Sequence, residues 1–274
     1  MDLLDPRRPF RSPWLYDCKP FHMVDNVYYV GNTSVSSHLF DTGDGLLLLD
    51  TGYMETGYLM LEAIRELGFD PKDIKWILHS HAHIDHFGST RMLVEKYGCK
   101  TYMPAPDVCM LGEKKELLWT REFGIHFEPP YDTWFNVDHA VQIGETLTFG
   151  NTKVTVYSAA GHTPGTVAYV FELPCGLKAA MHGGIGVNTM TSEYSRKFGL
   201  GTSWRDAYAA SLDRLEDLQV DVVLGNHPKQ TKTFEKLAAM TAECNTFIDP
   251  TEWKKFIVNT RKMFQEAIAN DPID

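Results

Sequence analysis

Residues 79–86 read His-Ser-His-Ala-His-Ile-Asp-His, and this run constrains the chain more than any other feature. Imidazole nitrogens and carboxylate oxygens are the ligands that a borderline divalent ion such as zinc prefers. Four such side chains within six residues can face one point only if the run forms a tight turn. The mostly apolar residues 74–78 before it predict a buried strand that ends at this turn. The sequence therefore predicts a metal site at the end of a strand.

Two single histidines occur in loop-like contexts further along the chain. His162 lies in Ala-Gly-His-Thr-Pro-Gly (160–165) and His227 lies in Leu-Gly-Asn-His-Pro (224–228), each after a strand-like stretch. Alone, either histidine would more often be a loop or core residue. Together with the histidine run they bring the candidate ligands to six. Six suit two ions better than one, because a structural zinc is closed by four protein groups whereas a catalytic zinc keeps an open position for water.

These motifs resemble those of the metallo-β-lactamase superfamily, in which a His-x-His-x-Asp-His loop, a Gly-His-Thr-Pro-Gly loop and a late histidine assemble a dinuclear site. The resemblance covers nearly the whole chain. It begins at residues 26–31, runs through 45–52 and continues past 225–228. It implies an α/β fold of the αββα sandwich type, with two mixed β-sheets face to face and helices outside.

The resemblance also implies which residues hold each ion. The first metal would be bound by His81, His83 and His162, and the second by Asp85, His86 and His227. In the family, a carboxylate at the end of an early strand orients a ligand histidine, and Asp50 stands at that position. A turn residue at a strand end is the equally weighted alternative for Asp50.

Within the superfamily, the order of motifs is most similar to the third subclass of metallo-β-lactamases, in which both metals use only His and Asp ligands. The stretches that match are 70–74, which leads into the histidine run, 149–150, before the strand that feeds His162, and the strand 221–224, before His227.

The segment 180–186, which reads Ala-Met-His-Gly-Gly-Ile-Gly, departs from the family pattern. Many superfamily hydrolases of lactones, thioesters and phosphodiesters carry a metal-bridging Asp here, and Gly184 stands at that position. The third-subclass lactamases keep a serine here that positions the substrate carboxylate, and this chain lacks it. His182 is a possible extra ligand, although a packing role at a strand end is favoured.

Two stretches, 117–136 and 186–204, are expected to flank the metals and to select the substrate. The first is rich in aromatic residues, and the second could bind a substrate carboxylate in place of the missing serine. The expected contacts are Trp119 and Phe127 in the first stretch and Tyr194 and Arg196 in the second. For an exposed residue such as Arg196, a solvated surface position is the favoured alternative.

Strand-like and helix-like stretches come in two similar batches without a Ser/Gly linker between them. We therefore expect a single domain over 1–274, with halves of roughly 1–140 and 141–274 that must pack together to complete the site. The pattern at 203–206 predicts a capping box at the start of a helix. A final helix from about 249 carries one apolar stripe that indicates core packing.

The composition favours a small-molecule enzyme. The net charge of −10, from 26 basic and 36 acidic residues, disfavours a nucleic-acid partner. No apolar run is long enough to cross a membrane. Five cysteines without zinc-finger spacing favour a reducing compartment. No export segment is seen at the start of the chain, so a cytoplasmic location is expected unless the sequence is that of a mature exported form. The oligomeric state is not predicted.

The predicted function is a dinuclear zinc hydrolase with two Zn²⁺ per chain. Zinc lowers the pKa of a bound water from about 15.7 towards about 7, and the metal-bound hydroxide would attack the carbonyl of a cyclic amide of the β-lactam kind. Asp85 is the expected catalytic residue, which orients the hydroxide and takes up its proton. The alternative is a cytoplasmic lactonase, esterase or thioesterase on the same dizinc site.

Two further alternatives are disfavoured. Superfamily members with two irons that reduce oxygen or nitric oxide usually have Glu where this chain has His83, so the ligand set favours zinc. A metal-binding module without catalysis is disfavoured because all six expected ligands are present and each metal keeps an open position.

Overall fold

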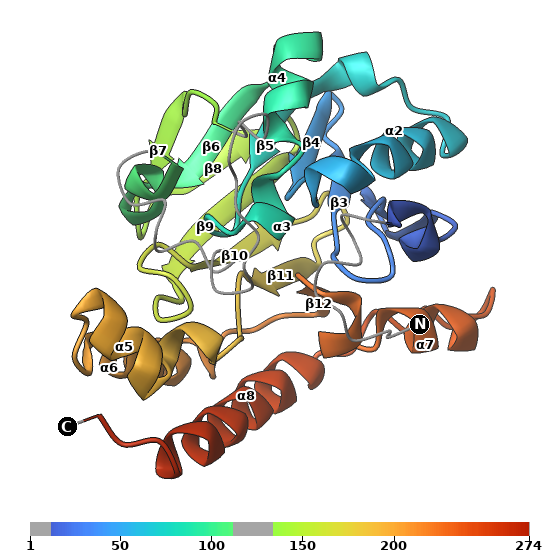
Figure 1. Cartoon of the computed structure of the whole chain (residues 1–274). Helices are drawn as coiled ribbons and strands as arrows, with labels where there is room; N and C mark the ends of the chain where they lie inside the picture. Colours follow the sequence, from blue (N-terminus) through green and yellow to red (C-terminus); the bar gives the residue numbers. More distant parts are fainter. Residues whose placement is uncertain (1–11, 112–133, 274) are drawn as a thin grey trace.

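The computed structural model describes residues 12–111 and 134–273 (Figure 1). In these residues two β-sheets pack face to face and helices cover their outer faces. The αββα sandwich predicted from the sequence is confirmed.

The first sheet is built from residues 21–141 and has the order β1-β2-β3-β4-β5-β6-β7. The strands β1 to β4 pair antiparallel with one another, and β4 to β7 pair parallel. Their bounds are Phe21–Val24, Val27–Tyr29, His38–Asp41, Leu46–Leu49, Ile74–Leu78, Lys100–Pro104 and His139–Val141.

The second sheet is built from residues 146–225 and has the order β12-β11-β10-β9-β8. All its pairs are antiparallel except β11 with β12. The bounds of β8 to β12 are Thr146–Phe149, Thr152–Ser158, Val167–Glu172, Lys178–His182 and Val222–Gly225.

The helices between the strands are mostly short. The α-helices α2 to α8 span Gly57–Glu66, Ile84–Phe87, Thr90–Tyr97, Ser192–Phe198, Ser203–Leu215, Thr233–Ala239 and Glu252–Ala269. The 3₁₀ helices η1 to η4 span Pro13–Tyr16, Met54–Thr56, Pro71–Asp73 and Ala105–Leu111, and η7 and η8 span Asn188–Met190 and Pro228–Gln230. Over the described residues, every helix is too short or too polar to span a lipid bilayer.

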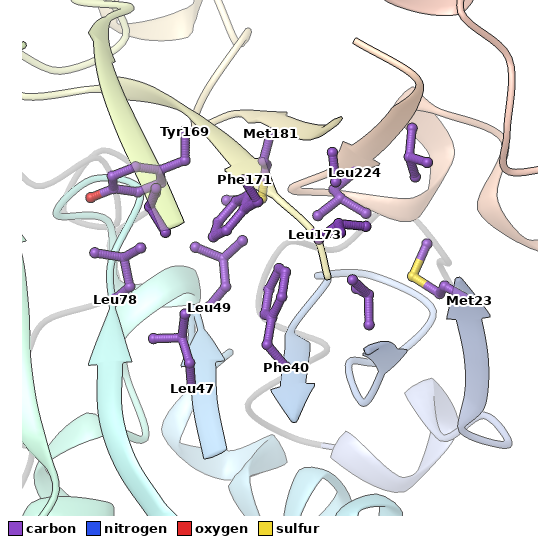
Figure 2. Packing of buried hydrophobic residues seen from close by; sticks show 14 of the residues in the cluster. Met23, Phe40, Leu47, Leu49, Leu78, Tyr169, Phe171, Leu173, Met181 and Leu224 are labelled. Atoms are coloured by element: carbon purple, nitrogen blue, oxygen red, sulfur yellow. The ribbon is translucent and has the colours of Figure 1, made fainter. Parts of the chain in front are cut away.

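The main core lies between the two sheets, as Figure 2 shows. Successive side chains of a strand point to opposite faces, so Leu47 and Leu49 of β4 point inward towards Phe171 and Met181 of the other sheet. The rings of Phe40 and Phe171 stack across the interface with centroids 4.5 Å apart. This contact holds the sheets together behind the loops that carry the candidate ligands.

The alternate residues of the same strands pack against the outer helices. Leu46 and Leu48 lie in a cluster with Ile64 of α2 and Leu93 of α4. On the other sheet, Val170, Ala180 and Val223 pack with α6 and α8. Both faces of β4 are therefore covered, which explains why the strand reads as four consecutive leucines.

The strand predicted over 74–78 coincides with β5, and the strand predicted over 221–224 lies one residue earlier than β12. The predicted capping box is wrong: the N-cap of α6 is Thr202, whose hydroxyl donates to Asp206 at 2.7 Å instead of capping the helix. Strand β1 and helices α5 and α7 were not predicted. The apolar stripe of α8 does face the core, through residues that include Trp253, Ile257 and Phe264.

Candidate metal centre

The candidate ligands follow the carboxyl ends of three strands that come together at one edge of the sandwich. The histidine run begins directly after β5, and its last residues, Asp85 and His86 among them, lie in helix α3. His162 lies in the loop after β9, and His227 lies two residues after β12. The fold thus gathers residues up to 146 positions apart in the sequence (81 to 227).

Three histidines form the first group. The ring centroids of His81 and His83 are 4.7 Å apart, those of His81 and His162 are 4.9 Å apart, and those of His83 and His162 are 4.5 Å apart. One ligand atom from each lies within 4.8 Å of the others, and all three side chains are buried. This is the arrangement of ligands that a single divalent ion needs.

Asp85, His86 and His227 form the second group, again with ligand atoms within 4.8 Å of one another. One carboxylate oxygen of Asp85, Oδ2, is 3.4 Å from Nε2 of His86 and 3.5 Å from Nε2 of His227. The two groups adjoin, since the ring centroids of His81 and His86 are 4.4 Å apart. The structure therefore brings all six predicted ligands together, in the two sets expected from the sequence.

Hydrogen bonds from Nδ1 orient the rings of three of the candidate ligands. Nδ1 of His86 donates to Asp50 at 2.8 Å, Nδ1 of His162 donates to the carbonyl of Gly186 at 2.7 Å, and Nδ1 of His227 donates to the carbonyl of Ser34 at 2.8 Å. These bonds select the tautomer whose Nε2 lone pair is available to an ion.

Asp50 serves both groups. Its backbone is in the left-handed region, with φ of 57°, which Asp adopts more readily than most residues. Besides holding His86, its carboxylate accepts bonds from the backbone N–H of Ser80 at 2.8 Å and from the Ser80 hydroxyl at 2.7 Å. The same hydroxyl accepts from Nδ1 of His81 at 3.0 Å. Asp50 thus orients one histidine directly and another through Ser80.

The site mixes neutral and charged groups. Burial lowers the pKa of His162 to about 4, so its ring is neutral at pH 7, as a metal ligand must be. Burial also disfavours charge on His86, but Asp85 and Asp50 outweigh it and raise the pKa of His86 to about 10. Burial likewise opposes ionisation of Asp85, yet His86 and His227 keep the pKa of Asp85 below its usual range. A metal at the second group must therefore displace a proton from His86.

The donor set fits zinc. Nε2 of His81 is buried and has no hydrogen-bond partner among the described residues, a costly state that an ion at this point would relieve. Three protein ligands per group would leave an open position on an ion bound there, as in catalytic zinc sites.

Asp107, in η4, is a site residue that the sequence did not reveal. It is fully buried and accepts bonds from the backbone N–H of Ala82 at 2.8 Å and of Gly165 at 2.6 Å, and from the Thr163 hydroxyl at 2.6 Å. Burial raises the pKa of Asp107 to about 6 despite these bonds. A lone carboxylate in the otherwise apolar stretch 105–111 was the only signal.

Gly184 lies against His162. A Cβ added to Gly184 would stand 2.3 Å from Cδ2 of the His162 ring, far inside van der Waals contact. His182 points away from the ligands, because its ring lies near Tyr208 of α6 and Phe256 of α8. His182 is a buried residue of the outer layer, in line with the packing role favoured for it.

The predicted substrate contacts lie in different settings. Tyr194 and Arg196 are on α5, where Tyr194 is 3% exposed and packs on Phe198 and Trp204 while Arg196 is exposed. Trp119 and Phe127 are outside the described residues. The segment before α5 does reach the site, because the hydroxyl of Thr189 donates to the His162 carbonyl at 2.7 Å.

Comparisons with known proteins agree with this geometry. A family model described as the metallo-beta-lactamase superfamily matches residues 30–174. The chain belongs to the metallo-β-lactamase superfamily, whose members include the hydrolases that this fold and this ligand set resemble.

Within that superfamily the chain is similar to subclass B3. The crystal structure of BJP-1, a subclass B3 metallo-β-lactamase of Bradyrhizobium japonicum, matches with a TM-score of 0.78 and 26% identity over 94% of this chain and 97% of that one. Native FEZ-1 metallo-β-lactamase from Legionella gormanii matches with a TM-score of 0.80 and 27% identity over 92% and 96%.

A curated relative matches over a shorter stretch. A probable metallo-hydrolase of Methanocaldococcus jannaschii is 26% identical over 127 residues, which are 46% of this chain. The match spans 57% of the length of that relative. It supports a metal-dependent hydrolase and says nothing about the substrate.

Proposed function

We propose that this protein is a dinuclear zinc hydrolase that opens a cyclic amide of the β-lactam kind or a similar carboxylic acid derivative. The observation that carries the proposal is the adjoining pair of three-ligand groups. Both groups consist of His and Asp side chains alone, and further hydrogen bonds orient ligands in each group. A structural zinc site would instead be closed by four protein ligands.

Bound zinc would supply Lewis acidity, which lowers the pKa of water to about 7 and polarises a carbonyl. In this proposal Asp85 is the general base. It is ionised and 5% exposed, and it lies between His86 and His227. Its carboxylate can therefore orient an attacking water and accept a proton from it.

The ligand loop is backed by buried apolar side chains. Ala82, Ile84 and Phe87 of the ligand loop and of α3 are buried with Tyr53 in one apolar cluster. Apolar walls lower the local dielectric constant and strengthen charge interactions at the reacting centre. The His227 side chain is 33% exposed whereas His86 is 1% exposed. We propose that substrate enters over His227.

The absent serine argues against β-lactam turnover, and the alternative is a lactone, ester or thioester substrate. Gly184 argues against the superfamily hydrolases with a bridging Asp, because a side chain at this position would collide with His162. The similarity to BJP-1 and FEZ-1 supports the cyclic amide.

The test is hydrolysis of a chromogenic cephalosporin by protein of measured zinc content, with panels of lactones and thioesters assayed in parallel. Turnover that is lost with chelator and restored by zinc, and absent in His81→Ala, would support the dizinc lactamase. Turnover of lactones or thioesters alone would select the alternative. Failure to bind zinc at all would refute both.

A further inference from the structure

We propose that Asp107 is a positioning residue for the three-histidine group, and that it acts by joining the two loops that carry those histidines. This inference rests on the proposed zinc function. It concerns a residue outside the ligand set, which touches neither a candidate ligand side chain nor any reacting atom.

The two loops come from different sheets. His81 and His83 lie on the loop after β5 of the first sheet, and His162 lies on the loop after β9 of the second. A small shift between the sheets would therefore move His162 relative to the other two ligands. A zinc site tolerates only a few tenths of an ångström in its ligand distances, so something must hold the loops in register.

Asp107 makes that connection. One carboxylate oxygen, Oδ2, accepts from the N–H of Ala82, between the two histidines of the first loop, and from the hydroxyl of Thr163, next to His162. The other oxygen, Oδ1, accepts from the N–H of Gly165. Both loops are thus bound to a single buried carboxylate.

The three donors require a carboxylate at this position. All point at Asp107, whose two oxygens together provide the acceptors they need. In an asparagine, one of these oxygens becomes an NH₂ group, which would face either Gly165 N–H or the pair of donors from Ala82 and Thr163. Donor would then face donor at hydrogen-bond distance in a buried place, so one loop would lose its anchor. Space is also tight, because a Cβ on Gly165 would stand 2.6 Å from the carboxylate.

Asp50 provides the contrast. It contacts His86 of the second group and reaches His81 through Ser80, and the hydrogen bonds of its carboxylate go to Ser80 and His86 on the 80–86 loop. Asp107 alone of the two carboxylates bridges to the loop of His162. The structure therefore assigns Asp107 to the three-histidine group.

The experiment compares zinc affinity in proteins that retain one site each. His227→Ala leaves the three-histidine group intact, and His162→Ala leaves the Asp85 group intact. Asp107→Asn is added to each, and zinc dissociation constants are measured by competition with a chromogenic chelator. We expect Asp107→Asn to weaken zinc binding at least about tenfold in the His227→Ala protein, the range seen when outer partners of metal ligands are removed. We expect a change of less than about threefold in the His162→Ala protein, because its remaining ligands do not contact the bridge.

A matched control separates this effect from general destabilisation. Asp138→Asn alters a carboxylate that likewise accepts from a backbone N–H and a hydroxyl, both of Thr101, at the opposite end of β6. It should leave both zinc affinities unchanged. If Asp107→Asn does not fold, Thr163→Val removes one of the three bonds and should weaken the same site selectively by a smaller factor.

Equal zinc affinities with and without Asp107→Asn in the His227→Ala protein would overturn the inference. So would an equal loss in both backgrounds, since that would show a structural role alone. Absence of zinc binding by the unmodified chain would overturn the proposed function itself, and this inference with it.

Discussion

The missing side chain of Gly184 allows the His162 ring to occupy its position, since a Cβ would lie 2.3 Å from Cδ2 of that ring. We predict that Gly184→Ser displaces His162 and lowers bound zinc from two ions towards one per chain, although Ser is the smallest side chain that could restore a hydroxyl here. Zinc content after desalting, measured by atomic emission, tests this. Gly199→Asn is the control, because Gly199 has open space around it and a left-handed conformation that Asn tolerates. Full zinc content in Gly184→Ser would contradict the prediction.

We expect His182 to affect the stability of the protein. Burial lowers its pKa to about 3, and its Nε2 has no hydrogen-bond partner among the described residues. Below about pH 6.5 the unfolded chain takes up a proton that the folded chain refuses, so stability falls as pH falls from there towards 3. Between pH 7.5 and pH 5, the free energy of unfolding of the metal-free protein should fall by about 2 kcal/mol less in His182→Leu than in wild type.

Urea unfolding of metal-free wild type and His182→Leu at the two pH values measures this difference. At pH 7.5 the variant loses the bond that the Gly184 N–H donates to Nδ1 of His182 at 3.3 Å, but it also removes the unsatisfied Nε2. Because these two changes oppose each other, its stability should lie within about 1 kcal/mol of wild type. A residual pH dependence is expected from His38 and His79, whose pKa values burial lowers to about 4. Parallel pH dependences for the two proteins would show that His182 does not contribute.

At the scale of elements, α8 stabilises the second sheet without contacting the metal centre. Trp253 is 1% exposed, and its indole N–H donates to the Leu215 carbonyl of α6 at 2.7 Å. We predict that Trp253→Ala costs about 3–5 kcal/mol of unfolding free energy, whereas Val258→Ala, on the exposed side of the same helix, costs about 0.5 kcal/mol or less. Chemical denaturation measures both. Zinc content at 10–15 °C should stay at the wild-type value in both variants, and selective zinc loss in Trp253→Ala would show coupling that the structure does not contain.

Across the whole molecule, the candidate metals tie the two sheets to each other. Each group combines the loop after β5 with a loop from the second sheet. Ions that bind only the folded chain stabilise it by mass action, by about 4 kcal/mol at a free zinc concentration 1,000 times the dissociation constant. We predict a clear fall in melting temperature on chelation, measured by calorimetry. The double variant His162→Ala with His227→Ala should show little response, and an equal response would place the stabilising zinc elsewhere.

The histidine run, the two later histidines and their strand contexts carried the resemblance to the metallo-β-lactamase superfamily, and that resemblance implied the sandwich and the grouping of six ligands in two sets. These features are local, because a strand and the ligand loop after it are formed by consecutive residues. Strand β5 is an example, and its bounds matched the prediction. Strands β8 and β9 were also predictable, because their residues alternate or carry β-branched side chains.

Long-range contacts were decided by the tertiary structure alone. No local pattern marks Asp107 as the acceptor that joins the loops of His81 and His162, because its donors are 25 to 58 residues away. The crowding of Gly184 by His162 depends on the ends of two strands that meet at one edge of the second sheet. Helix α5 was missed because its residues show no clear helical repeat of apolar side chains. Sequence by itself determined the chemistry of the ligands, since ligand identity is a property of single residues. Only the packing of the two sheets determined which buried carboxylates hold those ligands in place, because that depends on distances that no stretch of sequence encodes.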